Sequence, residues 1–250
     1  MSAFPLTHLE VCIDSIESLH AAQQGGATRI ELCSSLALGG LTPSAGLMRQ
    51  AAKTASIPVY AMIRPRQGDF LFSSEDMEIM LSDIHQARQA GLHGVVIGVL
   101  TAQGKVDTSQ LAELMKAAKG LGVTFHRAID QCDNYTEALD AIMRAGCERV
   151  LSSGLQSTAL EGAETLADMV RYCGDRLSIM AGAGITASNA AKIVAQTGVK
   201  ELHLSGKTTR PSLMEHIAAG AHMGSQAIDD YTIPVTSSDK IAAVITALKY

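Results

Sequence analysis

Eight short apolar segments recur along the chain and alternate with amphipathic stretches. Each segment has about the length of a buried strand and is bounded by glycine, proline or polar residues. The segments lie at about residues 8–12, 29–33, 59–64, 94–98, 123–126, 149–153, 177–182 and 201–205. The stretches between them repeat apolar residues at helical spacing, as Met77, Met80 and Ile84 illustrate. The pattern predicts eight strands, each followed by a helix.

Four glycines support this count, because they stand at equivalent points of a weak internal repeat. Gly26, Gly91, Gly146 and Gly198 each close a helical stretch, and a short polar link then leads into the next strand. Glycine accepts the left-handed backbone conformation that commonly follows a helix C-terminus. These four glycines and the links that follow them precede the second, fourth, sixth and eighth strands, as expected if a double β–α unit is repeated four times.

Strands this apolar are buried on both faces, which is typical of parallel sheets covered by helices. Eight such units in 250 residues predict an α/β chain: a TIM-type (β/α)8 barrel forming a single domain over residues 1–250, with an irregular extension at about 206–237. The alternative is a doubly wound open sheet. It is less favoured because the first strand leads into CIDSIES rather than into a G-x-G-x-x-G turn.

The composition argues against several classes of partner. A net charge of −5 and scattered lysines and arginines do not favour a nucleic-acid-binding or basic membrane-binding surface. No apolar run approaches the roughly 20 residues that a membrane-spanning helix needs, and the first residues do not resemble a signal peptide. The five cysteines are odd in number and form no C-x-x-C pair, so we expect reduced thiols in a cytoplasmic protein.

The segment VTFHRAID begins as an apolar strand and ends in His126, Arg127 and Asp130. In barrels of this type the reactive side chains stand at the C-terminal ends of the strands, so we expect these residues at the mouth of the barrel. Residues two apart on a strand share a face, and the same argument gives a pair on several strands. The pairs are Glu10 with Cys12, Glu31 with Cys33, Arg64 with Arg66, Thr124 with His126, and His203 with Ser205.

Glu10 and Glu31 are expected one layer deeper than the mouth. A lone ionised carboxylate there would be very costly, so we expect Arg64 and Arg66 to pair with them, since the planar guanidinium suits carboxylates. The candidate catalytic residues are therefore Glu10, Glu31, Arg64, Arg66, His126, Asp130 and His203. Alternatively, these charges form a self-satisfied plug that stabilises the interior of the barrel.

Glycine-rich turns after the seventh and eighth strands predict an anion site, because such barrels often bind phosphate there through backbone N–H groups. The candidate residues are Gly182 and Gly184, Ser205 and Gly206, and Ser153 and Gly154 on the same rim. Alternatively, Gly182 and Gly184 serve only a tight turn.

Cys12 and Cys33 occupy matching positions, each two residues after a glutamate. Neighbouring strands lie about 4.8 Å apart, so the two sulfurs would face one another if the register aligns them. Two thiolates suit Cu(I), whereas the alternative is that both cysteines are small buried hydrophobes. Cys132, in the loop after His126, offers a third sulfur. A further group has loose spacing, and we expect a lid or a packed extension there rather than a metal site: Met214, His216, His222 and Met223.

Four stretches of the sequence resemble the CutC family, which is named for copper homeostasis. They are LEVCIDSIESLHAAQQGGATRIELCSSLALGGLTPSAG, IRPRQGDF, VTFHRAID and RVLSSGLQSTALEG, in this order between about residues 9 and 206. The resemblance implies a cytoplasmic TIM-type barrel, often a homo-oligomer, that handles copper and binds Cu(I) through cysteines matching Cys12 and Cys33. The family's Arg-Pro-Arg and His-Arg motifs match Arg64-Pro65-Arg66 and His126-Arg127, and its common G-G-D-F is Gln67-Gly68-Asp69-Phe70 here.

Two functions are open at this point. The first, which the resemblance favours, is a Cu(I)-binding protein of copper homeostasis with Cys12 and Cys33 as ligands. The second, which the polar mouth favours, is an isomerase- or lyase-like enzyme acting on a small phosphate- or carboxylate-bearing substrate. In that enzyme Arg64 and Arg66 would hold the anion, while carboxylates or histidines at the mouth would move protons.

Overall fold

The computed structural model describes residues 6–218, 220, 223 and 229–249. Its centre is a closed barrel of parallel strands that pair in chain order, with β8 closing the ring against β1. The strands are β1 (His8–Ile13), β2 (Arg29–Leu32), β3 (Val59–Met62), β4 (Gly94–Ile97), β5 (Gly122–Phe125), β6 (Arg149–Ser152), β7 (Ser178–Ala181) and β8 (Glu201–Leu204). The closed ring rules out the doubly wound sheet and confirms the predicted TIM-type (β/α)8 barrel.

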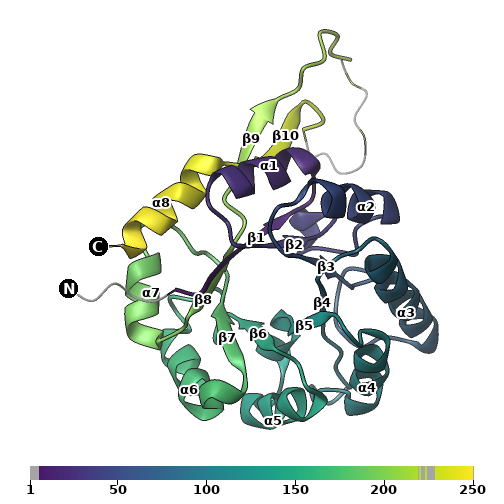
Figure 1. Cartoon of the computed structure of the whole chain (residues 1–250), viewed down its shortest axis with the longest axis vertical. Helices are drawn as coiled ribbons and strands as arrows, with labels where there is room; N and C mark the ends of the chain where they lie inside the picture. The colour runs from purple at the N-terminus through teal and green to yellow at the C-terminus, as the bar shows by residue number, and fades with distance from the viewer. Residues whose placement is uncertain (1–5, 219, 221–222, 224–228, 250) are drawn as a thin grey trace.

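Helices surround the barrel as an outer ring (Figure 1). They are α1 (Ile16–Gln24), α2 (Ala45–Thr54), α3 (Ser74–Gln89), α4 (Thr108–Ala117), α5 (Tyr135–Ala145), α6 (Ala163–Cys173), α7 (Ala190–Thr197) and α8 (Ser238–Leu248), with short 3-10 helices η1 (Leu36–Leu38), η2 (Arg127–Gln131) and η3 (Gly174–Arg176). In the described part of the chain, no helix is both long and apolar enough to cross a lipid bilayer.

Local sequence sets where these helices begin and end. The side chains of Ser15, Ser44 and Ser73 accept hydrogen bonds from the first turns of α1, α2 and α3, which satisfies backbone donors that have no partner within the helix. Gly146 and Gly198 follow α5 and α7 with φ of 87° and 73°. These are two of the positions at which the internal repeat predicts a helix end.

Alternation along the strands separates two environments. Residues such as Val11 and Ile30 point outward and join the main apolar cluster between the barrel and the helices. The alternate residues face the interior of the barrel, where a separate small cluster contains Cys33, Tyr60, Met62 and Val96. Most of the remaining interior side chains are polar or charged and are nevertheless buried, which makes the interior the place to look for a site.

A hairpin leaves the barrel within the extension expected at about 206–237. Its strands β9 (Lys207–Pro211) and β10 (Thr232–Thr236) are antiparallel, and the hairpin projects outward beside α1 (Figure 1). Arg210 donates to both carboxylate oxygens of Glu17 at 2.8 Å, which ties the base of the hairpin to α1.

The described methionines and histidine of the extension do not join the interior of the barrel. Met214, His216 and Met223 are exposed, and the chain after β9 continues outward from the barrel (Figure 1). His222 lies outside the described residues. The exposed residues therefore contribute no ligand to a site inside the barrel.

The loop after β6 passes so close to the start of α6 that Gly162 has no room for a side chain. A Cβ atom there would lie 2.0 Å from the backbone oxygen of Ser153. We therefore expect Gly162→Ala to lower the free energy of unfolding by about 1–3 kcal/mol, as measured by urea denaturation. Gly46→Ala in α2 is the control, because its nearest contact would be 3.7 Å away and alanine favours a helix by about 1 kcal/mol. Equal losses in both variants would contradict the steric explanation.

Candidate metal centre

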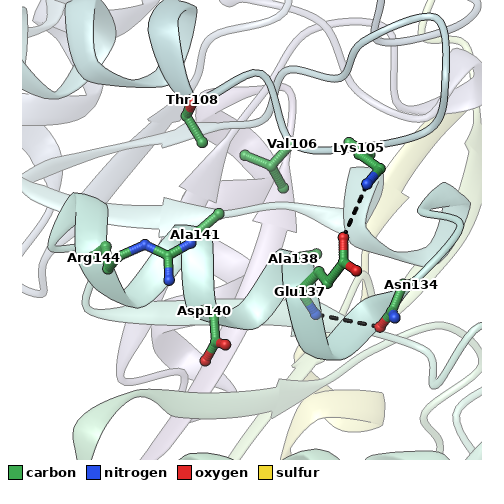
Figure 2. Close-up of a pocket in the computed structure, with 9 residues that line it drawn as sticks. All are labelled: Lys105, Val106, Thr108, Asn134, Glu137, Ala138, Asp140, Ala141 and Arg144. Carbon is green, nitrogen blue, oxygen red and sulfur yellow. Dashed lines mark hydrogen bonds and ion pairs between the residues drawn. The ribbon is translucent and has the colours of Figure 1, made fainter.

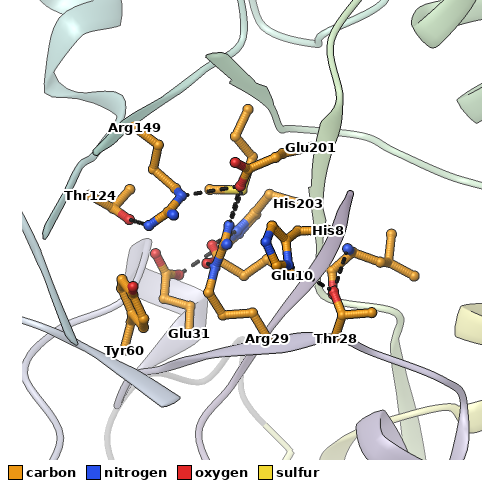
Figure 3. A network of polar contacts seen from close by, with 12 residues as sticks. His8, Glu10, Thr28, Arg29, Glu31, Tyr60, Thr124, Arg149, Glu201 and His203 are labelled. Atoms are coloured by element: carbon orange, nitrogen blue, oxygen red, sulfur yellow. Dashed lines mark hydrogen bonds and ion pairs between the residues drawn. The ribbon is translucent and has the colours of Figure 1, made fainter. Parts of the chain in front are cut away.

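A chain of buried ion pairs crosses the interior of the barrel at the N-terminal ends of the strands (Figure 3). Arg149, the first residue of β6, donates to Glu201 on β8 at 3.1 Å. Glu201 also accepts from Arg29, the first residue of β2, and Arg29 in turn donates to Glu10 on β1. The ring of Tyr60 lies against both arginines, with its centroid 5.6 Å from Cζ of Arg29 and 5.3 Å from Cζ of Arg149. Two carboxylates and two guanidinium groups thus neutralise one another away from water.

His203 joins this chain on the side of the mouth. Its Nδ1 lies 2.8 Å from Oε1 of Glu10, and its Nε2 lies 3.8 Å from Oε2 of Glu31. Burial alone would raise the pKa of Glu10, but the hydrogen bond from His203 and the charge of Arg29 lower that pKa to about 2. Burial would lower the pKa of His203, whereas its neighbours Cys12 and Glu31 raise it well above the ordinary value. Glu10 is therefore an ionised acceptor that fixes the imidazole ring.

Three potential metal ligands meet beside this imidazole. One ligand atom each from Cys12, Glu31 and His203 lies within 4.8 Å of the others, and all three residues are buried. The barrel register brings them together, because Cys12 stands opposite Glu31 between β1 and β2, and Glu10 stands opposite His203 between β1 and β8. We refer to Cys12, Glu31 and His203 as the metal group.

The register does not align Cys12 with Cys33, which was the condition for their sulfurs to face one another. The parallel register places Glu31 opposite Cys12, so Glu31 is level with Cys12 rather than one layer deeper, and Cys33 stands one step closer to the mouth. Cys33 still contacts the metal group, since its Sγ donates to Oε2 of Glu31 at 3.5 Å. Burial raises the pKa of the Cys33 thiol, and the charge of Glu31 raises it further. Burial also raises the pKa of Glu31, whose Oε1 has no hydrogen-bond partner among the described residues.

The expected pairing of Arg64 and Arg66 with the interior glutamates is wrong. Arg29 stands directly opposite Glu10 in the register and takes that role. Arg64 lies past the end of β3, where loop carbonyl groups are closer than the glutamates, and it donates to the backbone oxygens of residues 38, 40 and 68 at 3.1, 3.2 and 2.8 Å. Arg66 is partly exposed and pairs with Asp69 and Asp76 at 3.1 and 3.2 Å.

Arg64 thereby holds two loops over the mouth. One is the loop of residues 34–41, closed on itself by a bridge between Ser34 and Leu41, and the other is the loop of residues 64–70. Gly40 in the first loop has φ of 84°, and a Cβ atom there would lie 3.0 Å from Sγ of Cys33. The loop therefore packs directly on the thiol, in agreement with the complete burial of Cys33.

His126 lies at the mouth beyond β5 and not in the metal group. Its ring packs closely on Gly98, where a Cβ atom would come within 2.3 Å of Cε1, and it lies 4.8 Å from the ring centroid of Phe70. Its Nδ1 accepts a hydrogen bond from the N–H of Ala128 at 3.1 Å. Burial and the nearby charge of Arg64 lower the pKa of His126 to about 3, so the ring is neutral at physiological pH.

Asp130 organises the loop after β6. Its carboxylate accepts hydrogen bonds from the hydroxyl of Ser152 at 2.6 Å, from the N–H of Ser153 at 3.0 Å and from Nε of Arg127 at 2.8 Å. Since these donors surround its oxygens, Asp130 has a positioning role in the loop. The sequence places it correctly in the loop after β5, where it lies in η2, but gives no sign of these partners.

Neighbouring atoms pack closely against several of the candidate anion-binding residues. Ser153, Gly154 and Gly182 are buried, Ser205 and Gly206 are half-buried, and Gly184 is exposed. A Cβ atom at Gly154 would lie 2.2 Å from the backbone oxygen of Gly162, and one at Gly182 would lie 2.6 Å from Cδ1 of Leu151. These close approaches account for the glycines without a ligand, and the anion site at these turns stays a prediction.

Two surface hollows lie on the outer ring of helices. One, of about 310 Å³, lies along α4 and α5, where Lys105 pairs with Glu137 at 3.1 Å (Figure 2). The other, of about 340 Å³, lies between α3 and α4 near Met77 and Gln110. Neither hollow contains a residue of the metal group or of the barrel mouth.

Sequence reasoning missed Arg29, Arg149 and Glu201. For Arg29 and Glu201 a sequence signal was present, because Arg29 is two residues before Glu31, and Glu201 is two residues before His203. The alternation that selected the mouth residues therefore also selects these residues for the interior, one layer toward the N-terminal ends of the strands.

Removing one partner of the buried ion pair between Glu10 and Arg29 should strongly destabilise the protein. We expect Glu10→Gln to lower the free energy of unfolding by about 3–5 kcal/mol, because removing one partner leaves a buried charge without compensation. Urea denaturation at pH 7 measures the effect. Glu17→Gln is the control, since it breaks the exposed ion pair with Arg210 and should change stability little. A similar small effect at Glu10 would contradict the assigned role.

His126 should make the protein sensitive to acid. The pKa of His126 in the folded protein is about 3, below the ordinary value of 6.5. Between about pH 6.5 and pH 3, this residue is therefore protonated in the unfolded chain and neutral in the folded protein. Stability from this residue is thus complete above pH 6.5 and is lost at up to about 1.4 kcal/mol per pH unit below it. In His126→Asn the amide oxygen can still accept from Ala128, but the titration is gone. The stability difference between the two proteins should therefore shift against wild type on acidification, and a pH-independent difference would refute the assignment.

The comparisons with known proteins extend over the whole barrel. The CutC family model matches residues 7–208, a range that contains the barrel strands and every residue of the metal group. A "family protein CutC" of Photobacterium profundum is 70% identical over 241 residues, covering 96% of this chain and 98% of that protein. One of Vibrio parahaemolyticus is 57% identical over 246 residues, covering 98% of this chain and 100% of that protein.

Solved structures support both the family and the fold. The "Putative Copper Homeostasis Protein CutC" from Streptococcus agalactiae has a TM-score of 0.76 at 32% identity, covering 79% of this chain and 98% of that chain. Thiamine phosphate pyrophosphorylase from Pyrococcus furiosus has a TM-score of 0.59 at 15% identity, covering 99% of this chain and 98% of that chain, and this likeness concerns the fold alone. The family model and the close relatives together establish that this chain belongs to the CutC family.

Proposed function

We propose that the protein binds Cu(I) at the metal group and handles copper in the cytoplasm. The observation that carries the proposal is the meeting of buried ligand atoms from Cys12, Glu31 and His203 within 4.8 Å. Protein ligands lie about 2.0–2.3 Å from a bound metal ion, so a small adjustment of these side chains brings all three onto one ion.

The kinds of donor favour a soft or borderline ion. A thiolate and an imidazole suit Cu(I) and Zn(II), whereas a carboxylate is a harder ligand. Cys33 is a second thiol at 3.5 Å from the Glu31 carboxylate. If the Cys33 sulfur replaced the harder oxygen, the ligand set would be Cys, Cys, His, which favours Cu(I).

The setting of His203 is that of a metal ligand. Metal-binding histidines commonly hold their second ring nitrogen against a carboxylate, which orients the ring and fixes its tautomer. Glu10 provides this contact at 2.8 Å and is itself held by Arg29. Nε2 is left facing Glu31, and a bound metal would displace a proton from it, so that affinity should fall in acid.

Two further observations support copper and the cytoplasm. The five cysteines are free thiols and are all buried, as expected in a reducing compartment. The solved relative from Streptococcus agalactiae carries copper homeostasis in its name. A catalysed reaction has less support, because the terminal nitrogens of Arg64 and the guanidinium of Arg66, which were expected to hold a substrate, are engaged by carbonyl groups and aspartates.

Anaerobic Cu(I) titration against a competing chelator tests the proposal. Wild type should bind one Cu(I), and Cys12→Ser and His203→Gln should each weaken binding by more than about 100-fold, since they remove a ligand. Glu10→Gln should weaken binding by about 10–100-fold through the orientation of His203. Cys173→Ser is the control, because this thiol lies in α6 outside the barrel and should leave the affinity unchanged.

Two outcomes would contradict the proposal in different ways. If Cys12→Ser binds Cu(I) as tightly as wild type, the metal group is not the copper site. If the same variants abolish tight Zn(II) binding while wild type binds Cu(I) weakly, the metal group stands but its assignment to copper fails.

A further inference from the structure

Two buried hydrogen-bond donors at the mouth have no partner among the described residues: Nε of Arg64 and Nε2 of His126. The two residues are 7% and 3% exposed, so water does not freely solvate these atoms. A buried donor without an acceptor costs about 1–3 kcal/mol. Two of them at the same end of the barrel therefore indicate an acceptor that the described residues do not supply.

The hydrogen bonding of His126 determines which nitrogen carries its proton. Nδ1 accepts from the N–H of Ala128, so in the neutral ring the proton is on Nε2. The close packing of the ring on Gly98 fixes its direction. Nε2–H is thus a permanently oriented donor.

Arg64 is a buried cation without a carboxylate. Its two terminal nitrogens donate to backbone carbonyl groups, which carry no net charge, and no described carboxylate forms an ion pair with it. The adjacent cation Arg66 adds to the positive potential. Because buried charges are normally paired, the missing partner of Arg64 is an anion.

Both residues contact the same aromatic ring, that of Phe70. The ring of Phe70 lies 4.8 Å from the ring of His126 and 5.1 Å from Cζ of Arg64, and the charge of Arg64 is strong enough at His126 to lower its pKa. Phe70 supplies an apolar wall, and the loops of residues 34–41 and 64–70 cover the place.

We propose that Arg64 and His126 form a subsite for a small carboxylate, whose oxygen accepts from Arg64 Nε and His126 Nε2 while its apolar end packs on Phe70. The subsite uses the ends of β3 and β5, whereas the metal group uses β1, β2 and β8. It goes beyond copper binding and does not depend on it.

Sodium acetate is the probe, with sodium chloride at the same ionic strength as the reference. In wild type labelled with ¹⁵N-histidine, acetate should shift the Nε2 resonance of His126 in a saturable, single-site manner and should raise the melting temperature. Calorimetric titration should show binding about 10–100-fold weaker in His126→Asn, which retains the contact with Ala128 and loses the donor.

Matched variants separate this proposal from others. Arg66→Lys alters the neighbouring cation and should bind acetate as wild type does, whereas Arg64→Lys keeps the charge, loses Nε–H and should bind about tenfold more weakly. Cys12→Ser should retain acetate binding even though the copper site is lost. The proposal is overturned if acetate acts on wild type no differently from chloride, or if His126→Asn, folded by circular dichroism, binds acetate as tightly as wild type.

Discussion

The contact between Arg29 and Glu10 is the interaction on which the interior of this barrel depends. Burying two ions costs several kcal/mol each, and their attraction repays that cost only when the remaining hydrogen-bonding capacity is also satisfied. Here Nη2 of Arg29 donates to Glu201, and Oε1 of Glu10 forms a hydrogen bond with Nδ1 of His203. The pair is therefore one part of a continuous chain of contacts. Removing any member leaves its neighbour in the chain without a hydrogen-bonding partner.

This arrangement explains why the interior is charged, although apolar side chains would fill it at a lower cost in free energy. A buried ion pair is weak evidence for stability, and hydrophobic replacements of similar volume are often neutral or stabilising. The charged groups fix the orientation of a side chain, because Glu10 holds the imidazole of His203 in one orientation beside Cys12 and Glu31. The plug hypothesis and the site hypothesis thus describe two layers of the same interior: a self-neutralising layer below, and above it the layer of Cys12, Glu31 and His203, in which Oε1 of Glu31 has no hydrogen-bond partner among the described residues.

The fold was accessible from the sequence because it depends on local patterns. Eight apolar segments and the glycines at the helix ends identify the strands, and the direction of parallel strands identifies the end that carries reactive residues. Alternation also placed Glu10, Glu31, Cys12 and His203 inside. The partners were less accessible, because the relative shift between neighbouring strands is a property of the closed ring and not of any one segment. A shift of two residues sets Cys12 against Glu31 instead of Cys33. The role of Arg64 depends on carbonyl groups of two loops, whose path no strand pattern describes.

The junction of β8 with β1 has a consequence for how the protein is made. Glu10 and His203 are 193 residues apart in the sequence, so the contact that completes the interior is among the most non-local in the molecule. Contacts of this kind are slow to form, because the closure of a long loop precedes the gain from the contact. On the ribosome the first seven β–α units are synthesised while Glu10 and Arg29 still lack their partners on β8. The ring therefore cannot close until residues 201–204 have emerged, and any sheet formed before then would have its first and seventh strands as unpaired edges, which are prone to association with other chains.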